Sequence, residues 1–292
     1  MISKSFSLTR LLSPFGWLNL FFLVCLSILM FFSISHVTWK FSLLILLGIY
    51  FFLLFLGVRK ISWNFFLPSI SRLSSVILDG HEHSNKKTVL FTFDDGPCPK
   101  ITPYLLDLLQ KRGVKALFFC IGSKVRQFPE LARRIIEEGH EIGNHSYHHS
   151  WWTNFLLTQG MIHEIEKAQE AIQNATNLRP RFYRPPMGLT NPHLARALQK
   201  QGLVLMGWNA GGGDQKKKDA NFLFQRIWPK IKNQSIILLH DGKNDKEKIL
   251  ALVDLLIRAL KENDYDILSP NRITLKSENF WNSKGKSLYV NQ

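Results

Sequence analysis

Two adjacent carboxylates, Asp94 and Asp95, follow an apolar run in the segment TFDDGP. Neighbouring carboxylates repel each other unless a cation or a proton lies between them. The pair therefore suits a metal ligand beside a general base, and the dipeptide Gly96-Pro97 would supply the turn that presents them. A plain surface turn is the alternative at this point, because Asp, Gly and Pro all favour turns.

Two histidines four residues apart, His145 and His149, form the second candidate, in the segment NHSYHH. On a helical turn this spacing would place both imidazoles on one side, within reach of one ion. The spacing alone is weak evidence in a chain with ten histidines. Two imidazoles and one carboxylate are nevertheless a known catalytic zinc set with an open position for water, so Asp95 completes a candidate metal site. We expect His148 to point elsewhere.

An arginine and another histidine follow two further apolar runs. Arg184 begins the segment RPPMG, and His240 lies within LLHDG. An arginine held by two prolines can fix a carboxylate in one orientation. A histidine after an apolar strand is a candidate general acid. Taken separately, the first segment also fits a surface turn and the second an ordinary strand end.

Short β-branched or aromatic runs alternate with helical patterns from residue 86 onward, which is typical of βα units around a parallel sheet. We expect strands at 88–93, 116–121, 141–143, 182–184, 203–208, 235–239 and 265–268. Helical patterns lie between them, at 102–111, 129–138, 159–173, 192–201, 220–232 and 245–261. This alternation predicts a barrel or an open doubly wound sheet. Either architecture would bring the carboxyl ends of the strands, and the candidate residues with them, to one edge.

The four motifs each follow an expected strand and carry chemical groups that complement one another. This combination argues against the alternative that each motif is an ordinary surface turn or strand end. With TFDDGP, HSYHH, RPPMG and LLHDG in this order and spacing, the region from about Lys86 to Leu268 resembles the polysaccharide deacetylases of the NodB-homology type, carbohydrate esterase family 4. The resemblance implies an α/β fold, a distorted (β/α)7-type barrel. It also implies removal of N-acetyl groups from amino sugars with a divalent metal, zinc first, and cobalt, manganese or nickel as alternatives.

The resemblance assigns roles to the groups that react. The metal ligands would be Asp95, His145 and His149. Asp94 would be the general base that takes a proton from the metal-activated water, and Arg184 would orient Asp94.

The resemblance also assigns residues to the leaving group and the glycan. His240 would protonate the departing amine, and Asp214 would hold His240 in place. The backbone N–H of Met187 would stabilise the oxyanion. Leu238 would line the pocket for the acetyl methyl group, and Trp208 would contribute to the substrate groove.

The chain departs from the family pattern after the fifth expected strand. Members usually carry Asp-x-x-Asp-Trp there, whereas Gly211 replaces the first Asp of this chain and Gln215 replaces the Trp. Asp214 aligns with the second Asp. Met187 stands where Tyr is common. These changes alter the expected sugar groove and leave the reacting groups in place.

The first 78 residues contain no Asp or Glu, and two long apolar runs, 15–35 and 41–58, lie among them. A helix needs about 20 residues to cross a bilayer, and neither run has the polar stripe of a soluble helix. We expect a membrane anchor over 1–60 in which two transmembrane helices form a hairpin. An interfacial linker would follow over 61–85, and the catalytic domain over 86–292. A clear cleavage site is missing, which disfavours a signal peptide.

The formal net charge of +15 favours an anionic partner. For an anchored chain the nearest is membrane lipid, and the sequence has no aromatic-basic motif for nucleic acid. Lys4 and Arg10 precede the hairpin, and Arg59 and Lys60 follow it. The positive-inside rule therefore places the catalytic domain of this multi-pass protein on the cytoplasmic side. The extracytoplasmic side is the alternative, because relatives that trim finished cell wall act there.

These features predict a membrane-anchored, metal-dependent amidohydrolase acting on an N-acetylated glycan: peptidoglycan, its precursor or a related N-acetylglucosamine polymer. An O-acetyl carbohydrate esterase is the alternative enzyme, since the same attack cleaves an ester. A catalytically inactive glycan-binding membrane protein is the alternative outside enzymes. The sequence contains neither GxSxG nor HExxH, which argues against a serine hydrolase and a thermolysin-like protease.

Overall fold

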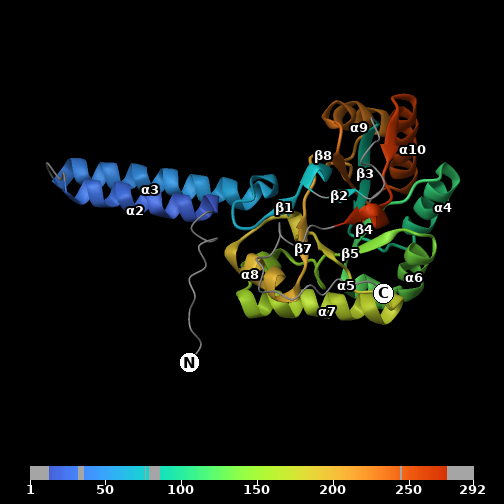
Figure 1. Ribbon diagram of the computed structural model, residues 1–292, viewed down its shortest axis with the longest axis horizontal. Helices are drawn as coiled ribbons and strands as arrows, with labels where there is room; N and C mark the ends of the chain where they lie inside the picture. Colours follow the sequence, from blue (N-terminus) through green and yellow to red (C-terminus); the bar gives the residue numbers. More distant parts are fainter. Residues whose placement is uncertain (1–12, 32–35, 76, 79–85, 244, 275–292) are drawn as a thin grey trace.

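The computed structural model of the chain contains a helical hairpin and an α/β domain (Figure 1). It describes residues 13–31, 36–75, 77–78, 86–243 and 245–274. The hairpin consists of α2 (Pro14–Phe31) and α3 (His36–Arg59), which lie side by side and project from one side of the domain.

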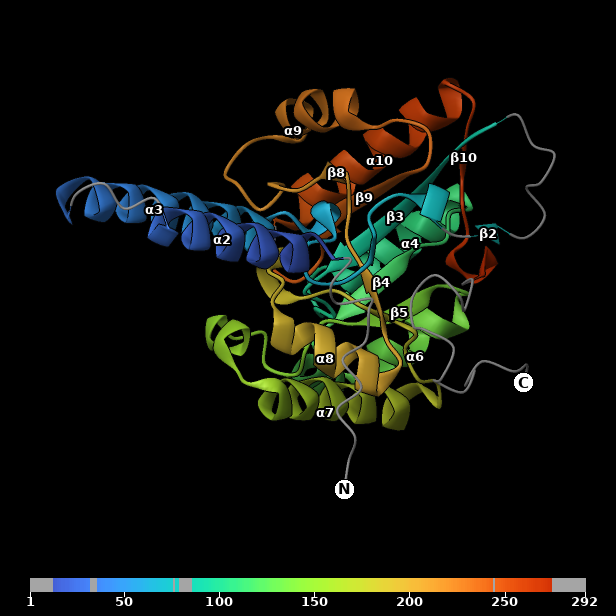
Figure 2. The ribbon, with the colours of Figure 1, turned by 60° about the vertical axis from the view of Figure 1, so that its left-hand side comes forward.

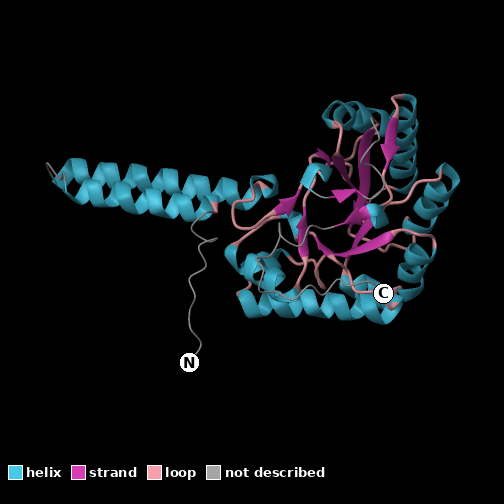
Figure 3. Cartoon of the chain, in the orientation of Figure 1, coloured by secondary structure: helices cyan, strands magenta, loops and turns pink. Residues whose placement is uncertain are grey.

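A curved parallel sheet forms the centre of the domain, with helices around it (Figure 3). Its strands follow the order β1 (Ser69–Ile70), β7 (Val204–Met206), β6 (Phe182–Tyr183), β5 (Glu141–Asn144), β4 (Leu117–Cys120), β3 (Lys87–Asp94), β9 (Ser235–His240) and β8 (Ala210–Gly211). β10 (Tyr265–Ile267) pairs with the first half of β3, and β2 (Ile77–Leu78) forms a separate antiparallel pair with β11 (Ile273–Thr274). The α/β class and a half-barrel of parallel strands are therefore confirmed.

Most helices return the chain from one strand to the next. They are α4 (Thr102–Arg112), α5 (Gly122–Gln127), α6 (Pro129–Glu137), α7 (Thr158–Thr176), α8 (Pro192–Gln201), α9 (Ala220–Ile227) and α10 (Lys246–Glu262). The 3-10 turns are η1 (Ile61–Trp63), η2 (Leu73–Ser75), η3 (Trp151–Phe155), η4 (Pro186–Gly188), η5 (Trp228–Lys230) and η6 (Pro270–Arg272). The seven predicted strands and six predicted helices are all present. The helix predicted over 220–232 is shorter, because Pro229 lies in a 3-10 turn that ends it.

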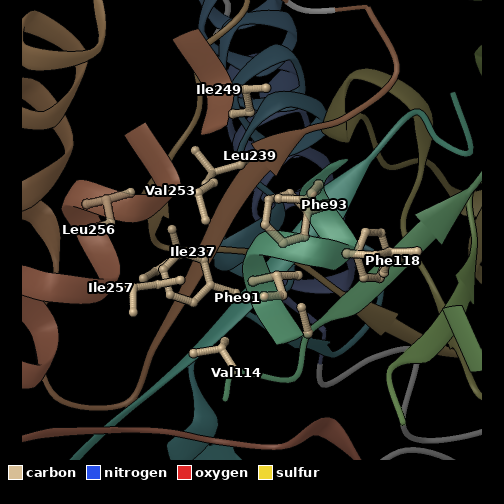
Figure 4. Packing of buried hydrophobic residues seen from close by; sticks show 14 of the residues in the cluster. Phe91, Phe93, Val114, Phe118, Ile237, Leu239, Ile249, Val253, Leu256 and Ile257 are labelled. Atoms are coloured by element: carbon tan, nitrogen blue, oxygen red, sulfur yellow. The ribbon is translucent and has the colours of Figure 1, made fainter. Parts of the chain in front are cut away.

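The two faces of β3 pack against different layers. Phe91 and Phe93 point outward into the main core with residues of β9 and α10, among them Leu239 and Val253 (Figure 4). Leu90 points inward into a second cluster that fills the barrel. Because side chains alternate along a strand, the inward face continues through Thr92 and Asp94. The fold therefore aims the end of β3 into the mouth of the barrel.

The hairpin differs in detail from the predicted pair of spans. α3 begins at His36, five residues before the predicted second span over 41–58, because residues 36–40 contain no Gly or Pro and continue as helix. Among the described residues, one helix is long and apolar enough to cross a membrane, Trp39–Arg59, with a mean hydropathy of 2.7. Pro14–Met30 is a shorter apolar helix. The sequence predicts two membrane-spanning helices, and the described residues contain one helix that meets the length and hydropathy criteria for a span.

The segment predicted as an interfacial linker contributes to the sheet. Ile70 pairs with Met206 of β7, and Arg72 forms a bridge with Ser235 of β9. The segment therefore spans the gap between two strands of the curved sheet. Ile70 and Leu73 are fully buried, which explains why this part of the chain does not remain at the surface. Residues 76 and 79–85 of the predicted linker lie outside the described residues.

Truncation of a core aromatic tests the packing of the α/β domain. Phe118 is fully buried, and its ring stacks on Phe93 at a centroid distance of 5.1 Å. Phe118→Ala should lower the free energy of unfolding by about 3–5 kcal/mol, because it leaves a cavity. Urea denaturation in mild detergent, followed by circular dichroism, measures this change. The exposed Phe222 is the control, and Phe222→Ala should cost about 0.5 kcal/mol or less. Equal losses for both variants would contradict the assigned core.

Candidate metal centre and active site

The carboxylate of Asp94 is fixed inside the barrel by Arg184. The Nη1 atom of Arg184 donates to Asp94 Oδ1 over 2.7 Å and to Thr92 Oγ1 over 2.8 Å. Both charged side chains are buried, and their pairing compensates for the water that each has lost. The structure thus places the predicted pair in direct contact.

The other two nitrogens of the Arg184 guanidinium also donate hydrogen bonds. Its Nε donates to the carbonyl of Met206 over 3.1 Å, and its Nη2 donates to the carbonyl of Gly207 over 2.9 Å. The ring of Phe119 lies 4.1 Å from the guanidinium carbon. Burial lowers the pKa of Arg184 from its ordinary value, while the charge of Asp94 opposes that shift. One side chain therefore connects β3 with the end of β7.

Three predicted ligands converge next to this pair. Asp95 Oδ1 lies 3.4 Å from His145 Nε2 and 3.1 Å from His149 Nε2. One ligand atom from each residue lies within 4.8 Å of the other two. One carboxylate oxygen and two imidazole nitrogens form a donor set that a divalent ion such as zinc accepts. The residues present therefore fit the metal that the sequence predicts.

The protonation states of these residues also suit a cation. Burial alone would raise the pKa of Asp95, but the hydrogen bond and charge of His145, with the charges of His149 and His240, hold it below its ordinary value. Burial lowers the pKa of His149 to about 4, and the charge of His145 contributes to that shift. Asp95 is thus ionised and His149 neutral at neutral pH, as metal ligation requires.

A bent loop, not a helical turn, brings the two histidines together. The prediction of a helical turn at this position is wrong, since Ser146 and His149 have the left-handed φ angles 62° and 53°. The side chain of Asn144 accepts a hydrogen bond from the Ser146 N–H, and the Ser146 hydroxyl accepts one from the His149 N–H. These two bonds stabilise the bend.

A carbonyl group orients the imidazole of His145. Its Nδ1 lies 2.7 Å from the backbone oxygen of Arg184, which can only accept, so Nδ1 carries the proton. Nε2 is the nitrogen that faces Asp95. His148 turns away as expected, because its Nδ1 lies 2.6 Å from Glu164 Oε1 on α7.

His240 and Asp214 form a second pair at the end of β9. Asp214 Oδ1 lies 2.8 Å from His240 Nδ1, and Asp214 Oδ2 accepts from the His240 backbone N–H over 2.9 Å. Burial lowers the pKa of His240, but the hydrogen bond and charge of Asp214, with the charges of Asp94 and Asp95, raise it to about 9. His240 is therefore protonated at neutral pH, with its Nδ1 held by Asp214.

The three predicted substrate residues occupy different depths. Met187 has a left-handed φ of 57° and an exposed side chain at the rim. Leu238 is buried on β9 below the loop that follows β8. Trp208 is half-buried against Gly188, where a β-carbon would lie 2.5 Å from its ring, and it packs on two core clusters. Leu238 and Trp208 thus support the site from below.

Two further residues contact the site. Gln215 Nε2 donates to Asp95 Oδ2 over 3.0 Å, so the residue that replaces the family Trp holds the second oxygen of a candidate ligand.

Asp241 is fully buried, and its N–H donates to the carbonyl of Asp94. Burial raises the pKa of Asp241 to about 7. Gly96 packs on this carboxylate, since a β-carbon there would lie 2.4 Å from it. The contacts of Gln215 and Asp241 with the site are not predicted from the sequence. The only sequence signals for these two residues are that Gln215 lies in the altered run after the fifth expected strand and that Asp241 lies in LLHDG.

Comparisons with known proteins agree with this geometry. Residues 81–206 match the polysaccharide deacetylase family. A peptidoglycan-N-acetylglucosamine deacetylase of Bacillus cereus is 30% identical over 192 residues, which cover 65% of this chain and 89% of that protein. The peptidoglycan-N-acetylglucosamine deacetylase PgdA of Listeria monocytogenes is 32% identical over 204 residues, which cover 70% of this chain and 41% of that protein. The chain thus spans less than half the length of the Listeria relative.

Solved structures share the fold, including one without activity. A family 4 carbohydrate esterase pseudoenzyme from Bacillus anthracis superposes with a TM-score of 0.58 at 29% identity, covering 63% of this chain and 64% of that one. Likeness of fold therefore does not establish catalysis, which depends on the residues at the strand ends. The motifs, the half-barrel and these alignments together establish that the chain belongs to the polysaccharide deacetylase family, the NodB-type domain of carbohydrate esterase family 4.

Proposed function

We propose that the protein is a membrane-anchored, metal-dependent deacetylase that hydrolyses the N-acetyl groups of an amino-sugar glycan. One observation carries this proposal: the donor set of Asp95, His145 and His149 lies beside Asp94 and His240, each fixed by its own buried partner. Names of relatives favour peptidoglycan as the glycan. Its precursor or a related N-acetylglucosamine polymer presents the same acetamide.

A divalent ion in the donor set would supply a Lewis acid that makes water nucleophilic and polarises the acetamide carbonyl. Asp94 would be the general base in this site. Its Oδ1 is held by Arg184, whereas its Oδ2 lies 3.9 Å from His145 Nε2, on the side of the donor set. Oδ2 is therefore the oxygen that can accept a proton where the reaction occurs.

His240 would be the general acid. It carries a proton at neutral pH, and the hydrogen bond to Asp214 keeps its Nδ1 occupied, so Nε2 would deliver a proton to the departing amine. Base and acid thus come from two adjacent strands, β3 and β9, on which Asp94 and His240 are direct partners in the register. The backbone N–H of Met187 and the side chain of Leu238 would bind the carbonyl oxygen and the acetyl methyl group.

We also propose that α2 and α3 both enter the membrane. Large apolar side chains on both helices are exposed, from Trp17 and Phe21 on α2 to Phe51 and Phe55 on α3. The helices pair through a hydrogen bond of 2.8 Å from Tyr50 Oη to Asn19 Oδ1. Their outward faces lack any protein partner in the described structure, and lipid would cover them at little cost.

Substitutions at neighbouring residues separate metal binding from proton transfer. His149→Ala should lose stoichiometric Zn²⁺, while His148→Ala, at a histidine paired with Glu164, should retain it. Asp94→Asn should retain Zn²⁺ and lower kcat by a factor of about 10² to 10⁴, because it removes the base. Metal content and acetate release from N-acetylglucosamine oligosaccharides are the measurements. Equal metal loss in Asp94→Asn and His149→Ala would reverse these assignments.

The pKa of His240 gives a second test. In chelator-treated protein, Asp214→Asn should lower that pKa from about 9 toward the ordinary 6.5, since only the charges of Asp94 and Asp95 then oppose burial. NMR titration of labelled histidine measures it, and Asp219→Asn, at an exposed helix cap, is the control. Because the folded-state pKa is raised, the stabilisation by protonated His240 is present below pH 6.5 and is lost as the pH rises through about 9. A pKa that stays near 9 in Asp214→Asn would contradict the pairing.

Reporter fusions at Gln292 test the side of the membrane. The positive-inside rule predicts activity of a reporter that works only in the cytoplasm. A reporter that works only after export should stay silent in the same position. A strong export-dependent signal would instead place the catalytic domain outside, with mature cell wall within its reach.

A further inference from the structure

An exposed apolar patch lies directly after the metal-binding loop. It consists of Trp151, Trp152, Phe155 and Leu157, in and just after η3, and their exposed fractions range from 54% to 72%. In the described α/β domain the other exposed large apolar residues are scattered singly, which needs no explanation. Here four such residues lie within seven positions of the chain. Both Trp151 and Trp152 lie near Phe155, with ring centroids 6.1 and 6.0 Å apart.

Hydrogen bonds connect this apolar patch to the end of α3. The N–H of Thr190 donates to the carbonyl of Val58 over 3.0 Å, and the side chain of Asn191 donates to the carbonyl of Asn154 over 3.0 Å. Two consecutive residues thus contact the hairpin on one side and η3 on the other. The apolar patch therefore lies close to the level at which α3 ends.

The direction of the hairpin agrees with these contacts. In Figure 2 the short helical turn that leads into α7 lies on the side of the domain from which α2 and α3 project. Arg59 and Lys60, which end the hairpin, and Trp63 after them are exposed. Basic and aromatic residues at the end of an apolar helix are typical of the headgroup region of a bilayer.

We propose that the apolar patch enters the membrane interface and holds the mouth of the active site against the lipid surface. This inference rests on the proposed insertion of the hairpin. The apolar patch continues that membrane-facing surface, and residues 150–160 contain no charged side chain. Trp and Phe side chains in a surface segment of this kind favour the boundary between headgroups and acyl chains.

The position of the apolar patch has a consequence for the substrate. Trp151 follows the ligand His149 by two residues, and Asn154 Nδ2 lies 3.9 Å from the sulfur of Met187 at the rim. An apolar patch in the interface would hold this rim next to the lipid. The substrate class that fits is an N-acetylated sugar carried on a membrane lipid, presented within reach of the headgroup plane.

Depth measurements on the full chain in vesicles of phosphatidylethanolamine and phosphatidylglycerol test the contact. In a chain with Cys25→Ala and Cys98→Ala, a fluorophore at Trp152→Cys should be quenched by lipid-borne quenchers. The same label at Leu178→Cys, an exposed apolar position at the far end of α7, should be quenched only from water. A label at Phe52→Cys reports insertion of the hairpin. If the label at position 52 contacts lipid and the label at position 152 contacts water, the inference about the patch is overturned and the proposed membrane anchor is retained. If both labels contact water, the proposed membrane anchor is overturned as well.

Activity measurements separate lipid from sugar as the occupant. The double variant Trp152→Glu, Phe155→Glu should keep its turnover of a soluble N-acetylglucosamine oligosaccharide. It should lose activity about tenfold or more on a vesicle-borne lipid-linked N-acetylglucosamine, because charges oppose interfacial binding. Equal loss on both substrates would show that the aromatic rings bind sugar and would overturn the inference, as would no loss on either.

Discussion

The buried ion pair of Arg184 and Asp94 is the interaction on which the rest of the site depends. A buried guanidinium is costly unless every donor has an acceptor. All three nitrogens of Arg184 donate, to the side chains of Asp94 and Thr92 and to the carbonyls of Met206 and Gly207, so four of its five N–H groups have acceptors. These acceptors come from β3 and from the end of β7. The curvature of the sheet is thus tied to the orientation of one carboxylate.

The same arginine acts through its backbone on the donor set. Its carbonyl accepts from His145 Nδ1, which directs Nε2 of that imidazole toward Asp95. The residue that orients the candidate base therefore also orients a candidate ligand. Base and ligand consequently keep a fixed relation, although Asp95 and His149 adopt the left-handed backbone region, which non-glycine residues rarely occupy.

Much of this arrangement could be predicted from the sequence, and the failures have physical causes. Strands such as β3 and β9 carry runs of apolar residues, whose pattern is a strong signal. β1 and β8 have two residues each, too few for any periodicity. The loop from His145 to His149 has the spacing of a helix, but bonds from the side chains of Asn144 and Ser146 bend it instead. Such local hydrogen bonds do not change the spacing of apolar residues in the sequence, so periodicity cannot predict them. The hydrogen bond from Gln215 to Asp95 joins residues 120 positions apart and depends on the tertiary structure.

The chain that leaves the helical hairpin is built into the sheet next to the candidate active site. From the end of α3 the chain passes through Ile61 and Phe65, both buried, to Ile70, which pairs with Met206. The carbonyl of Ile70 accepts from the N–H of Gly207, whose own carbonyl accepts from Arg184. Contacts of backbone and core thus take the place of a flexible linker between the hairpin and the α/β domain. Because the chain between the hairpin and the sheet is built into the fold, the orientation of α2 and α3 also sets the direction in which the candidate active site opens.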